Sequence, residues 1–334
     1  MNIIFFEIKE EYEQHIISNA FDQATLYSGT IQEYIEEYSI EKLKEFEIVS
    51  VFIYSQLNLE LLEQLPNIKL VSTRSTGKNH IDTQFCEKNN IEVVNVTKYG
   101  ENTVAEFAFA LLLTISRKII PSISQVKQGN FDFTHLQGFD LCGKTVGIIG
   151  FGNIGQKFAQ MCRGFEMNIL AFDAYPEQVE SKAKELGVTL ASLNEILDKS
   201  DIISLHVPLF PQTHHLINKE SISKMKKGVV LINTSRGELI DTQALLEGLE
   251  QEIISFVGLD VIEGECLMKE ESSRMLETDA TSKCDIKTLV QDHILINHSR
   301  VYLTPHNAFN TTDAVNKILN STISQINEFL ENNK

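Results

Sequence analysis

The sequence has no segment suited to crossing a membrane or to export. Its longest apolar stretch, around residues 107–113, is much shorter than the ~20 residues that a bilayer-spanning helix needs. The first residues, "MNIIFFEIKEEYEQ", have neither a cationic lead nor a small-residue cleavage pattern, and their apolar run has the length of a strand. We therefore expect neither a signal peptide nor a membrane partner.

Paired cysteines and an excess of basic residues are also missing. The five cysteines are odd in number, widely spaced and without a CxxC pair: Cys86, Cys142, Cys162, Cys266 and Cys284. This pattern favours reduced thiols in the cytoplasm over a disulfide framework or a zinc site. The formal net charge of −17, with no basic stripe, would repel a nucleic-acid backbone, so no nucleic-acid partner is expected.

What is present is typical of a soluble α/β protein. The 334 residues suffice for two domains, and 43% of them are hydrophobic. From residue 2 to about 97, apolar runs such as "NIIFFE", "ATLYSG", "EIVSVFIY" and "IEVVNV" alternate with amphipathic stretches. A second alternating block runs from "KTVGIIG" to "ISFVGLDVI". Strict alternation predicts two parallel sheets, each covered by helices on both faces.

Three further segments have distinct roles in this scheme. A nearly all-apolar helix is predicted to open at Thr103, with Glu106 completing a capping box. Its burial on several sides suggests an interdomain or subunit interface, and a homodimer if the latter. Residues 266–292 lose the alternating pattern and are interpreted as an excursion from the core. A last helix, from about Thr311 to Leu330, is predicted to cross back to the first block, which makes the N-terminal domain discontinuous.

A glycine-rich turn indicates a dinucleotide site. In "TVGIIGFGNIG", Gly150, Gly152 and Gly155 have the G-x-G-x-x-G spacing between a strand and a helix. Such glycines allow a tight turn, close approach of a pyrophosphate and close helix–strand packing. The next strand, "NILAFD", ends in Asp173, where a carboxylate accepts hydrogen bonds from an adenine ribose and repels a 2′-phosphate. The pattern therefore favours NAD over NADP.

Polar side chains follow three strands of the second block. Arg236 follows a buried strand in "INTSRGELID", Asp260 and Glu265 follow another in "GLDVIEGE", and His306 follows Pro305 in "LTPHNAF". Ligands of open α/β sheets bind at these carboxyl ends. Taken singly, each residue also has a structural interpretation, because the arginine could pair with a surface carboxylate, the glutamate lies in an acidic run and the histidine could cap a helix.

Together, Arg236, Glu265 and His306 match the needs of hydride addition to a 2-oxo acid. The planar guanidinium suits a carboxylate, the imidazole titrates in a suitable range, and a nearby carboxylate favours its protonated form. We therefore expect acid-assisted hydride transfer without a metal.

The sequence resembles the NAD-dependent D-isomer-specific 2-hydroxyacid dehydrogenases. The similar motifs are "GIIGFGNIG" with Asp173, "SDIISLHVPLFPQTHHLI", "MKKGVVLINTSRGELID", "GLDVIEGE" and "TPHNAF". The resemblance implies a discontinuous flavodoxin-like substrate domain, residues 1–100 plus 304–334, and a Rossmann NAD-binding domain, residues 101–303, with a cleft between them. It also implies a homodimer.

The resemblance also implies roles for individual residues. Arg236 would bind the substrate carboxylate and carbonyl, His306 would donate the proton, and Glu265 would be its partner. By the same likeness the substrate pocket would contain Tyr54, Tyr99 and Phe309, with backbone N–H groups of Thr76 and Gly77 on the carboxylate. The NAD site would be lined by Gly152, Asn153, Ile154, Gly155, Asp173, Val207, Pro208, Thr213, Thr234, Ser235 and Asp260.

The likeness is greatest to the lactate-forming members of the family, so the expected reaction is NADH-dependent reduction of pyruvate to D-lactate. Two positions depart from many relatives: Cys266 follows Glu265 in place of proline, and Phe107 stands where a histidine is common. His206, His214 and His215 lack metal-ligand spacing with carboxylates and are interpreted as structural. The alternatives are a dehydrogenase for a bulkier 2-oxo acid, such as 2-oxoisocaproate or phenylpyruvate, and an NADH-sensing binding protein.

Overall fold

The computed structural model describes residues 1–97, 99–265 and 286–333 of the chain. The chain divides into two compact units. Unit 1 comprises Met1–Gly100 and Asn310–Lys334, and unit 2 comprises Glu101–Phe309. The second boundary therefore lies between residues 309 and 310, whereas the sequence places it between 303 and 304.

Unit 1 is a five-stranded parallel sheet in the order β2-β1-β3-β4-β5. This is the flavodoxin-like strand order. Its elements are β1 (Ile3–Phe5), α1 (Glu11–Ala20), β2 (Thr25–Leu26), α2 (Ile31–Tyr38), α3 (Ile40–Leu43), β3 (Ile48–Val51), α4 (Leu59–Leu62), β4 (Leu70–Thr73), α5 (Thr83–Lys88), β5 (Glu92–Asn95) and α15 (Thr312–Asn332). The strand expected in "ATLYSG" is only two residues long.

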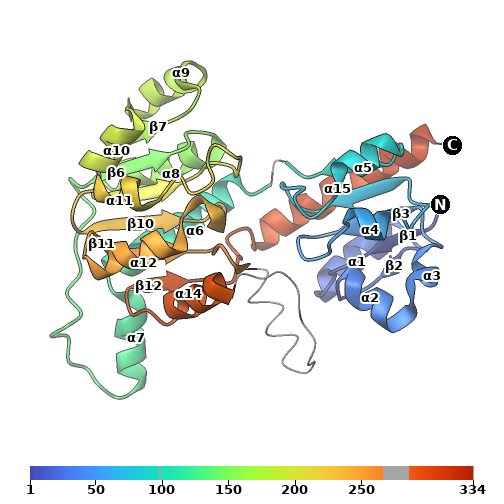
Figure 1. Cartoon of the computed structure of the whole chain (residues 1–334), viewed down its shortest axis with the longest axis horizontal. Coiled ribbons are helices and arrows are strands. Elements are labelled where there is room, and N and C mark those ends of the chain that lie inside the picture. Colours follow the sequence, from blue (N-terminus) through green and yellow to red (C-terminus); the bar gives the residue numbers. More distant parts are fainter. Residues whose placement is uncertain (98, 266–285, 334) are drawn as a thin grey trace. The chain divides into compact units, whose positions relative to one another are not determined.

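Unit 2 is a seven-stranded parallel sheet in the order β12-β11-β10-β9-β6-β7-β8 (Figure 1). Its elements are α6 (Glu101–Ser116), α7 (Ile119–Lys127), β6 (Thr145–Ile149), α8 (Asn153–Gly164), β7 (Asn168–Phe172), α9 (Pro176–Leu186), β8 (Thr189–Leu190), α10 (Leu193–Lys199), β9 (Ile202–Leu205), α11 (Lys219–Ser223), β10 (Val229–Asn233), the 3-10 helix η1 (Gly237–Leu239), α12 (Thr242–Glu250), β11 (Ile254–Leu259), α14 (Ile286–Ile296) and β12 (Val301–Leu303). The direction of the strand order reverses between β6 and β9, as in Rossmann folds.

Apolar residues on both faces of each sheet explain why these runs form strands. In β10, Val230 and Ile232 join the core on one face, and Val229 and Leu231 join the core on the other. Successive side chains of a strand point to opposite faces, so a continuous apolar run is buried only if both faces are covered. The expected fold class, two doubly wound parallel-sheet α/β units, is thereby confirmed.

The C-terminal helix α15 completes unit 1. Its residues Val315, Leu319, Ile326 and Phe329 pack into one hydrophobic core with β1 and other elements near the N-terminus. Its N-cap is Thr311, whose side chain accepts a hydrogen bond from the backbone N–H of Ala314. The helical spacing of apolar residues in the sequence therefore located this helix to within two residues of its observed bounds.

The helix predicted to open at Thr103 begins earlier. Helix α6 starts at Glu101, so Thr103 lies within its first turn and the predicted capping box with Glu106 is wrong. The side-chain carboxylate of Glu106 instead accepts a hydrogen bond from Asn102. The apolar residues of α6, including Phe109 and Leu112, are buried in the core that unit 2 forms with α8 and its sheet.

The excursion predicted for residues 266–292 is described only in part. Residues 266–285 lie outside the described residues, whereas residues 286–292 belong to helix α14, which packs near β12 and α12. Asp292 of this helix is fully buried, so the end of the segment belongs to the core of unit 2. In the described part of the chain, no helix has the length and hydrophobicity needed to traverse a bilayer.

Helix α7 differs from every other long helix of unit 2 because none of its residues is buried. Figure 1 shows it projecting from the sheet of its unit. The helix and the segment after it expose large apolar side chains: Ile119, Ile120, Ile123, Val126, Phe131 and Phe133. Such an exposed apolar surface is typical of a protein–protein interface.

Candidate active site

Three adjacent strands of unit 2 bring the predicted catalytic residues to one edge of the sheet. Arg236 follows β10, Glu265 follows β11 and His306 follows β12, and these strands are neighbours in the parallel sheet. The carboxyl ends of parallel strands meet at the same edge, so the three residues emerge on one side.

The side chains of His306 and Glu265 are in direct contact. The ring Nδ1 of His306 lies 3.0 Å from Oε1 and 2.9 Å from Oε2 of Glu265, and both residues are partly buried. A carboxylate accepts at Nδ1 when that nitrogen carries the proton, and this contact fixes the plane of the ring. Within the described residues, Nε2 of His306 forms no hydrogen bond and is left for a ligand.

The loop that carries His306 is anchored by the buried side chain of Asp260. The Asp260 carboxylate accepts hydrogen bonds from the Thr304 hydroxyl at 2.5 Å, the Asn307 N–H at 3.0 Å and the Ala308 N–H at 2.8 Å. His306 itself has φ of +53°, which is left-handed. Asp260 thus holds the residues on either side of a strained histidine.

Burial raises the pKa of the Asp260 carboxyl, although the hydrogen bonds from Thr304, Ala308 and Asn307 and the charge of His306 oppose this shift. Sequence reasoning placed Asp260 in the cofactor site. Its observed hydrogen bonds to Thr304, Asn307 and Ala308 also position the loop that carries His306.

Arg236 is partly buried at the end of β10. Its Nη1 donates to the backbone carbonyl of Ser235 at 2.6 Å, and its own carbonyl accepts from the side chain of Asn233 at 2.8 Å. The Ser235 hydroxyl donates to the carbonyl of Leu205 on β9, which ties the turn to the next strand. Within the described residues Arg236 forms no salt bridge, so its guanidinium remains available to an anion.

The glycine-rich turn has the geometry that the sequence motif requires. Gly150 has φ of +95°, and a Cβ there would collide with the backbone of His206. A Cβ on Gly155 would collide with the carbonyl of Gly150, so this glycine permits close helix–strand packing. Gly152, at the N-cap of α8, has open space around it. This opening and the free N–H groups of the helix N-terminus fit a pyrophosphate.

Asp173 lies beside this turn, at the end of β7. Its carboxylate accepts hydrogen bonds from the backbone N–H groups of Phe151 and Tyr175, both at 2.9 Å. Of the two predicted residues that open α8, Asn153 donates to the side chain of Glu101, and Ile154 packs against the hydrophobic core.

The remaining predicted cofactor residues follow β9 and β10. Val207 and Pro208 come directly after β9, and the hydroxyl of Thr213 donates to the carbonyl of Pro208 at 2.7 Å. Thr234 follows β10, and its buried Oγ1 has no hydrogen-bond partner within the described residues. An unpaired buried hydroxyl is costly unless a ligand completes it, so this edge fits a polar cofactor.

The predicted substrate residues of unit 1 follow three neighbouring strands. Tyr54 follows β3, Thr76 and Gly77 follow β4, and Tyr99 follows β5. The Thr76 hydroxyl donates to the carbonyl of Val96, and the Gly77 carbonyl accepts from the hydroxyl of Ser75. Phe309, the other predicted pocket residue, is partly buried at the end of unit 2.

Sequence reasoning missed Glu7. This buried residue has φ of +58°, and its carboxylate accepts from the N–H groups of Phe52 and Tyr54 and from the Ser55 hydroxyl, at 2.8, 3.0 and 2.7 Å. Glu7 therefore fixes the backbone of the segment that contains Tyr54. The sequence feature that could have indicated Glu7 is the placement of an acidic residue directly after the apolar run "NIIFF".

Arg74 was also missed, although it is almost fully buried next to these residues. Its guanidinium donates to the Ser50 hydroxyl and to the carbonyl of Phe6. Burial lowers the pKa of Arg74, while the charge of Glu7 opposes that shift. The buried charges of Arg74 and Glu7 thus compensate each other beneath the strand ends of unit 1.

The other histidines differ in their surroundings. His206 is enclosed, its Nε2 lies 2.9 Å from the Ser204 hydroxyl, and burial lowers its pKa to about 3. This neutral, packed ring fits the structural role expected from the sequence. His215, in contrast, has its Nε2 only 2.6 Å from Oε1 of Glu263, which lies in the loop after β11.

Comparisons with known proteins identify relatives of this chain. The profile of the D-isomer specific 2-hydroxyacid dehydrogenase family, NAD binding domain, matches residues 109–308. A 2-hydroxyacid dehydrogenase homolog of Zymomonas mobilis is 36% identical over 334 residues, covering 98% of this chain and 96% of that protein. The D-lactate dehydrogenase of Escherichia coli is 34% identical over 284 residues, covering 84% of this chain and 82% of that protein.

A solved structure extends the similarity to the whole fold. The D-lactate dehydrogenase of Aquifex aeolicus, in complex with NAD and lactic acid, matches with a TM-score of 0.85 and 34% sequence identity. The match covers 99% of this chain and 96% of that chain. Both units therefore have counterparts in one known structure.

Proposed function

Since this chain belongs to the D-isomer-specific 2-hydroxyacid dehydrogenases, which are NAD-dependent oxidoreductases, we propose that it reduces pyruvate to D-lactate with NADH. The family fixes the class of substrate, a small 2-oxo or 2-hydroxy acid. The choice of pyruvate and the roles of individual residues are our proposal.

The observation that carries this proposal is the His306–Glu265 pair, which lies one strand away from Arg236 at the same sheet edge. An anion-binding cation and a carboxylate-bound imidazole are the two groups that reduction of a 2-oxo acid requires from the protein. Each of them is held by its own strand end, so both are positioned before the substrate arrives.

The protein's part in the reaction is binding and proton transfer. NADH, when bound, supplies the hydride for C2 of the substrate. Arg236 binds the substrate carboxylate and polarises the adjacent carbonyl with its planar guanidinium. His306 donates a proton from Nε2 to the carbonyl oxygen as negative charge develops there. Glu265, in contact with Nδ1, keeps the ring oriented and compensates the positive charge of its protonated form.

The substrate's remaining groups are assigned to the residues that the sequence singled out. We assign Tyr54, Tyr99 and Phe309 to the small methyl group, and the backbone N–H groups of Thr76 and Gly77 to the carboxylate. Glu7 supports this assignment in unit 1, because it fixes the backbone of Tyr54 with a hydrogen bond of 3.0 Å.

We assign the cofactor to the carboxyl edge of the unit 2 sheet. The pyrophosphate is placed at Gly152, Asn153, Ile154 and Gly155, where open space and a helix N-terminus coincide. Asp173 binds the adenine ribose and disfavours a 2′-phosphate. The other residues assigned to the cofactor are Val207, Pro208, Thr213, Thr234, Ser235 and Asp260.

We further propose a cytoplasmic homodimer. The sequence suggested the apolar helix near Thr103 as the interface, but α6 buries those residues in its own unit. The exposed apolar side chains of α7 and of the segment after it supply the surface instead. A second copy of the chain would cover Ile120, Ile123 and Phe133, which water otherwise surrounds.

The proposal is tested by following NADH absorbance with a panel of 2-oxo acids. Pyruvate should give a higher kcat/KM than 2-oxoisocaproate or phenylpyruvate, and NADH should be preferred to NADPH. If the protein prefers a bulkier 2-oxo acid, that acid and not pyruvate is its substrate, and the proposal is wrong on this point. Arg236→Lys should raise the KM for pyruvate at least tenfold, because a lysine cannot bind a carboxylate through two parallel hydrogen bonds. An unchanged KM would exclude Arg236 as the carboxylate ligand.

A further inference from the structure

A cluster of three metal-ligating side chains lies outside the residues assigned to the reaction. His214 and His215 belong to the loop between β9 and α11, and Glu263 belongs to the loop after β11. One ligand atom from each residue lies within 4.8 Å of the other two. We propose that these three residues form a binding site for a divalent transition-metal ion such as Zn²⁺.

The ligand set indicates the class of ion. Two imidazoles and one carboxylate form a His₂Glu set, which binds zinc with a fourth position open to water. Nitrogen ligands favour zinc and its transition-metal neighbours over Mg²⁺ and Ca²⁺, which prefer oxygen. The net charge of −17 also favours accumulation of cations near the surface.

Supporting contacts already orient the carboxylate of Glu263. Its Oε2 accepts from the Thr242 hydroxyl at 2.9 Å and from the Thr242 N–H at 3.3 Å, while Oε1 faces Nε2 of His215 at 2.6 Å. Hydrogen bonds of this kind fix the direction of a ligand and are a regular feature of metal sites. A cation would replace the proton between Oε1 and Nε2, with a small separation of the two atoms.

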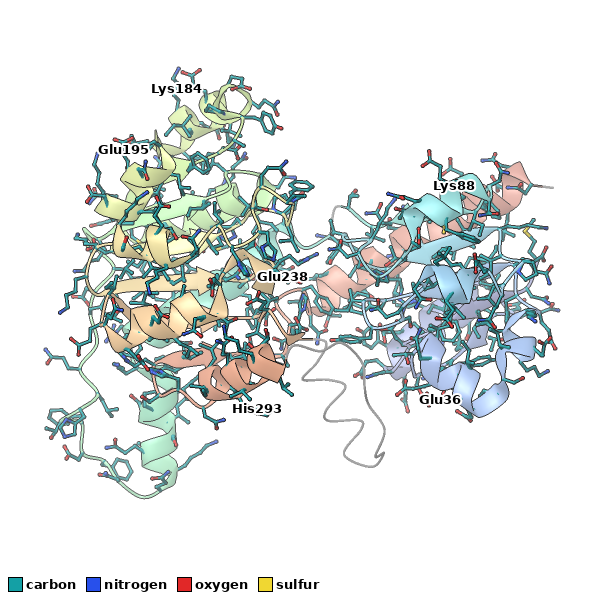
Figure 2. The ribbon with its side chains drawn as sticks, viewed as in Figure 1. Glu36, Lys88, Lys184, Glu195, Glu238 and His293 are labelled. Atoms are coloured by element: carbon teal, nitrogen blue, oxygen red, sulfur yellow. The ribbon has the colours of Figure 1, made fainter. Side chains whose placement is uncertain are left out.

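The backbone of His215 is equally constrained. It has φ of +51°, its N–H donates to the carbonyl of Glu238, and its carbonyl accepts from the side chain of Asn218. Glu238 is labelled in Figure 2. A non-glycine residue held in the left-handed region carries strain that the surrounding contacts must offset, and such residues concentrate at ligand sites.

An ion pair between His215 and Glu263 would account for the contact of these two side chains, but not for the position of His214 beside them. It is exposed, its ring lies against that of His215 with 3.9 Å between centroids, and within the described residues it forms no hydrogen bond. Its imidazole is therefore free to turn toward a shared cation. The sequence could not indicate this site, because Glu263 is 48 residues away from His215.

Zinc titration by calorimetry tests the proposal. The protein should be free of any affinity tag and carry Cys142→Ser, because the exposed thiol of Cys142 is itself a zinc ligand. We expect one zinc ion per chain in this parent and a rise in Tm on binding, since the ion favours the folded state. His214→Ala should weaken zinc binding at least tenfold without affecting folding, because this side chain is exposed and unbonded.

Two further variants make the test specific. Glu263→Gln keeps an oxygen that can accept from Thr242 but removes the charge, so it should also weaken zinc at least tenfold. His135→Ala, which removes an exposed histidine elsewhere in unit 2, should bind zinc like the parent. The proposal is overturned if the parent binds no zinc, or if His214→Ala binds as tightly as the parent. Equal binding of Ca²⁺ and Zn²⁺ would also overturn it, because it would indicate nonspecific attraction to acidic residues.

Discussion

His306 has a backbone conformation that few residues other than glycine adopt. Its φ of +53° is held by the hydrogen bonds that Asp260 accepts from the next two residues, and its ring is held by Glu265. Strain of this kind is retained in functional loops because it sets the direction of one side chain. The proposed proton donor is thus fixed through both its backbone and its ring.

Replacing His306 by asparagine tests its role with little effect on the backbone, because asparagine tolerates positive φ. The His306→Asn variant has no acidic proton for the carbonyl oxygen. We expect kcat for pyruvate to fall about 10²- to 10⁴-fold, the usual contribution of general acid catalysis. NADH binding, measured by fluorescence, should be unchanged. A variant that retained wild-type kcat would exclude His306 as the donor.

At this scale the sequence predicted the positions of the residues in the fold better than it predicted their contacts. The order of Arg236, Glu265 and His306 after successive apolar runs was enough to place them at strand ends. The support from Asp260 and Glu7 was not predictable, because their hydrogen-bond partners are backbone N–H groups and hydroxyls 44 to 48 residues away. Only the folded chain brings such groups within reach of one carboxylate.

At the scale of elements, the loop between β12 and the end of unit 2 depends on one carboxylate. In Asp260→Asn, one of the two acceptor oxygens becomes an amide donor that faces the donor N–H group of either Asn307 or Ala308, because these groups donate to different oxygens. The loop should then lose its fixed conformation, and kcat should fall at least tenfold. Crystallography of the variant should show a displaced His306, and a wild-type loop with wild-type kcat would contradict this prediction.

Helix α7 carries the prediction about assembly. Ile123→Asp places a charge on its exposed apolar surface, and we expect the dimer to dissociate into monomers because a buried unpaired charge is costly. The mass in solution, measured by light scattering, reports this change. Ile294→Asp on α14 is the matched control, since Ile123 and Ile294 are both 52% exposed. A monomeric wild type, or a dimeric Ile123→Asp variant, would contradict the proposed interface.

Helix α6 illustrates why the first residue of a helix is difficult to predict from the sequence. The sequence contains a Thr103–Glu106 spacing that is typical of a capping box, but the helix starts two residues before that threonine. Helix ends are uncertain by one or two residues, and a local capping signal alone does not fix them. The core contacts of α6 with α8 and the sheet begin only at Ala105.

At the scale of the whole molecule, a buried acid links pH to stability. Burial raises the pKa of Asp292 from 3.8 to about 6, although the N–H of Gly264 opposes the shift. Between these two pKa values, the Asp292 carboxyl keeps its proton in the folded protein but has lost it in the unfolded chain. The resulting stabilisation is complete below about pH 4 and is lost as the pH rises through 6.

Asp292→Asn should remove this dependence, because its amide oxygen can still accept from Gly264 and carries no charge. We expect the Tm of the variant, relative to wild type, to rise between pH 4.5 and pH 7. Thermal unfolding at several pH values measures this difference. A Tm difference that stays constant with pH would show that Asp292 ionises normally in the folded protein.

The architecture of the whole chain was largely predictable because it follows from repeated alternation of apolar and amphipathic segments. Even the return of α15 to unit 1 was indicated by its apolar spacing. The exposure of the apolar side chains of α7 was not predictable, because a short apolar run such as "IIPSISQVK" is equally compatible with a buried helix. Whether an apolar helix is covered depends on its neighbours in three dimensions.

The most direct test of the proposed function is the stereochemistry of its product. Purified protein is incubated with pyruvate and NADH, and the lactate formed is resolved by chiral chromatography. We predict D-lactate alone, formed in equal amount to the NADH consumed. Formation of L-lactate, or no oxidation of NADH with pyruvate, would contradict the proposed reaction.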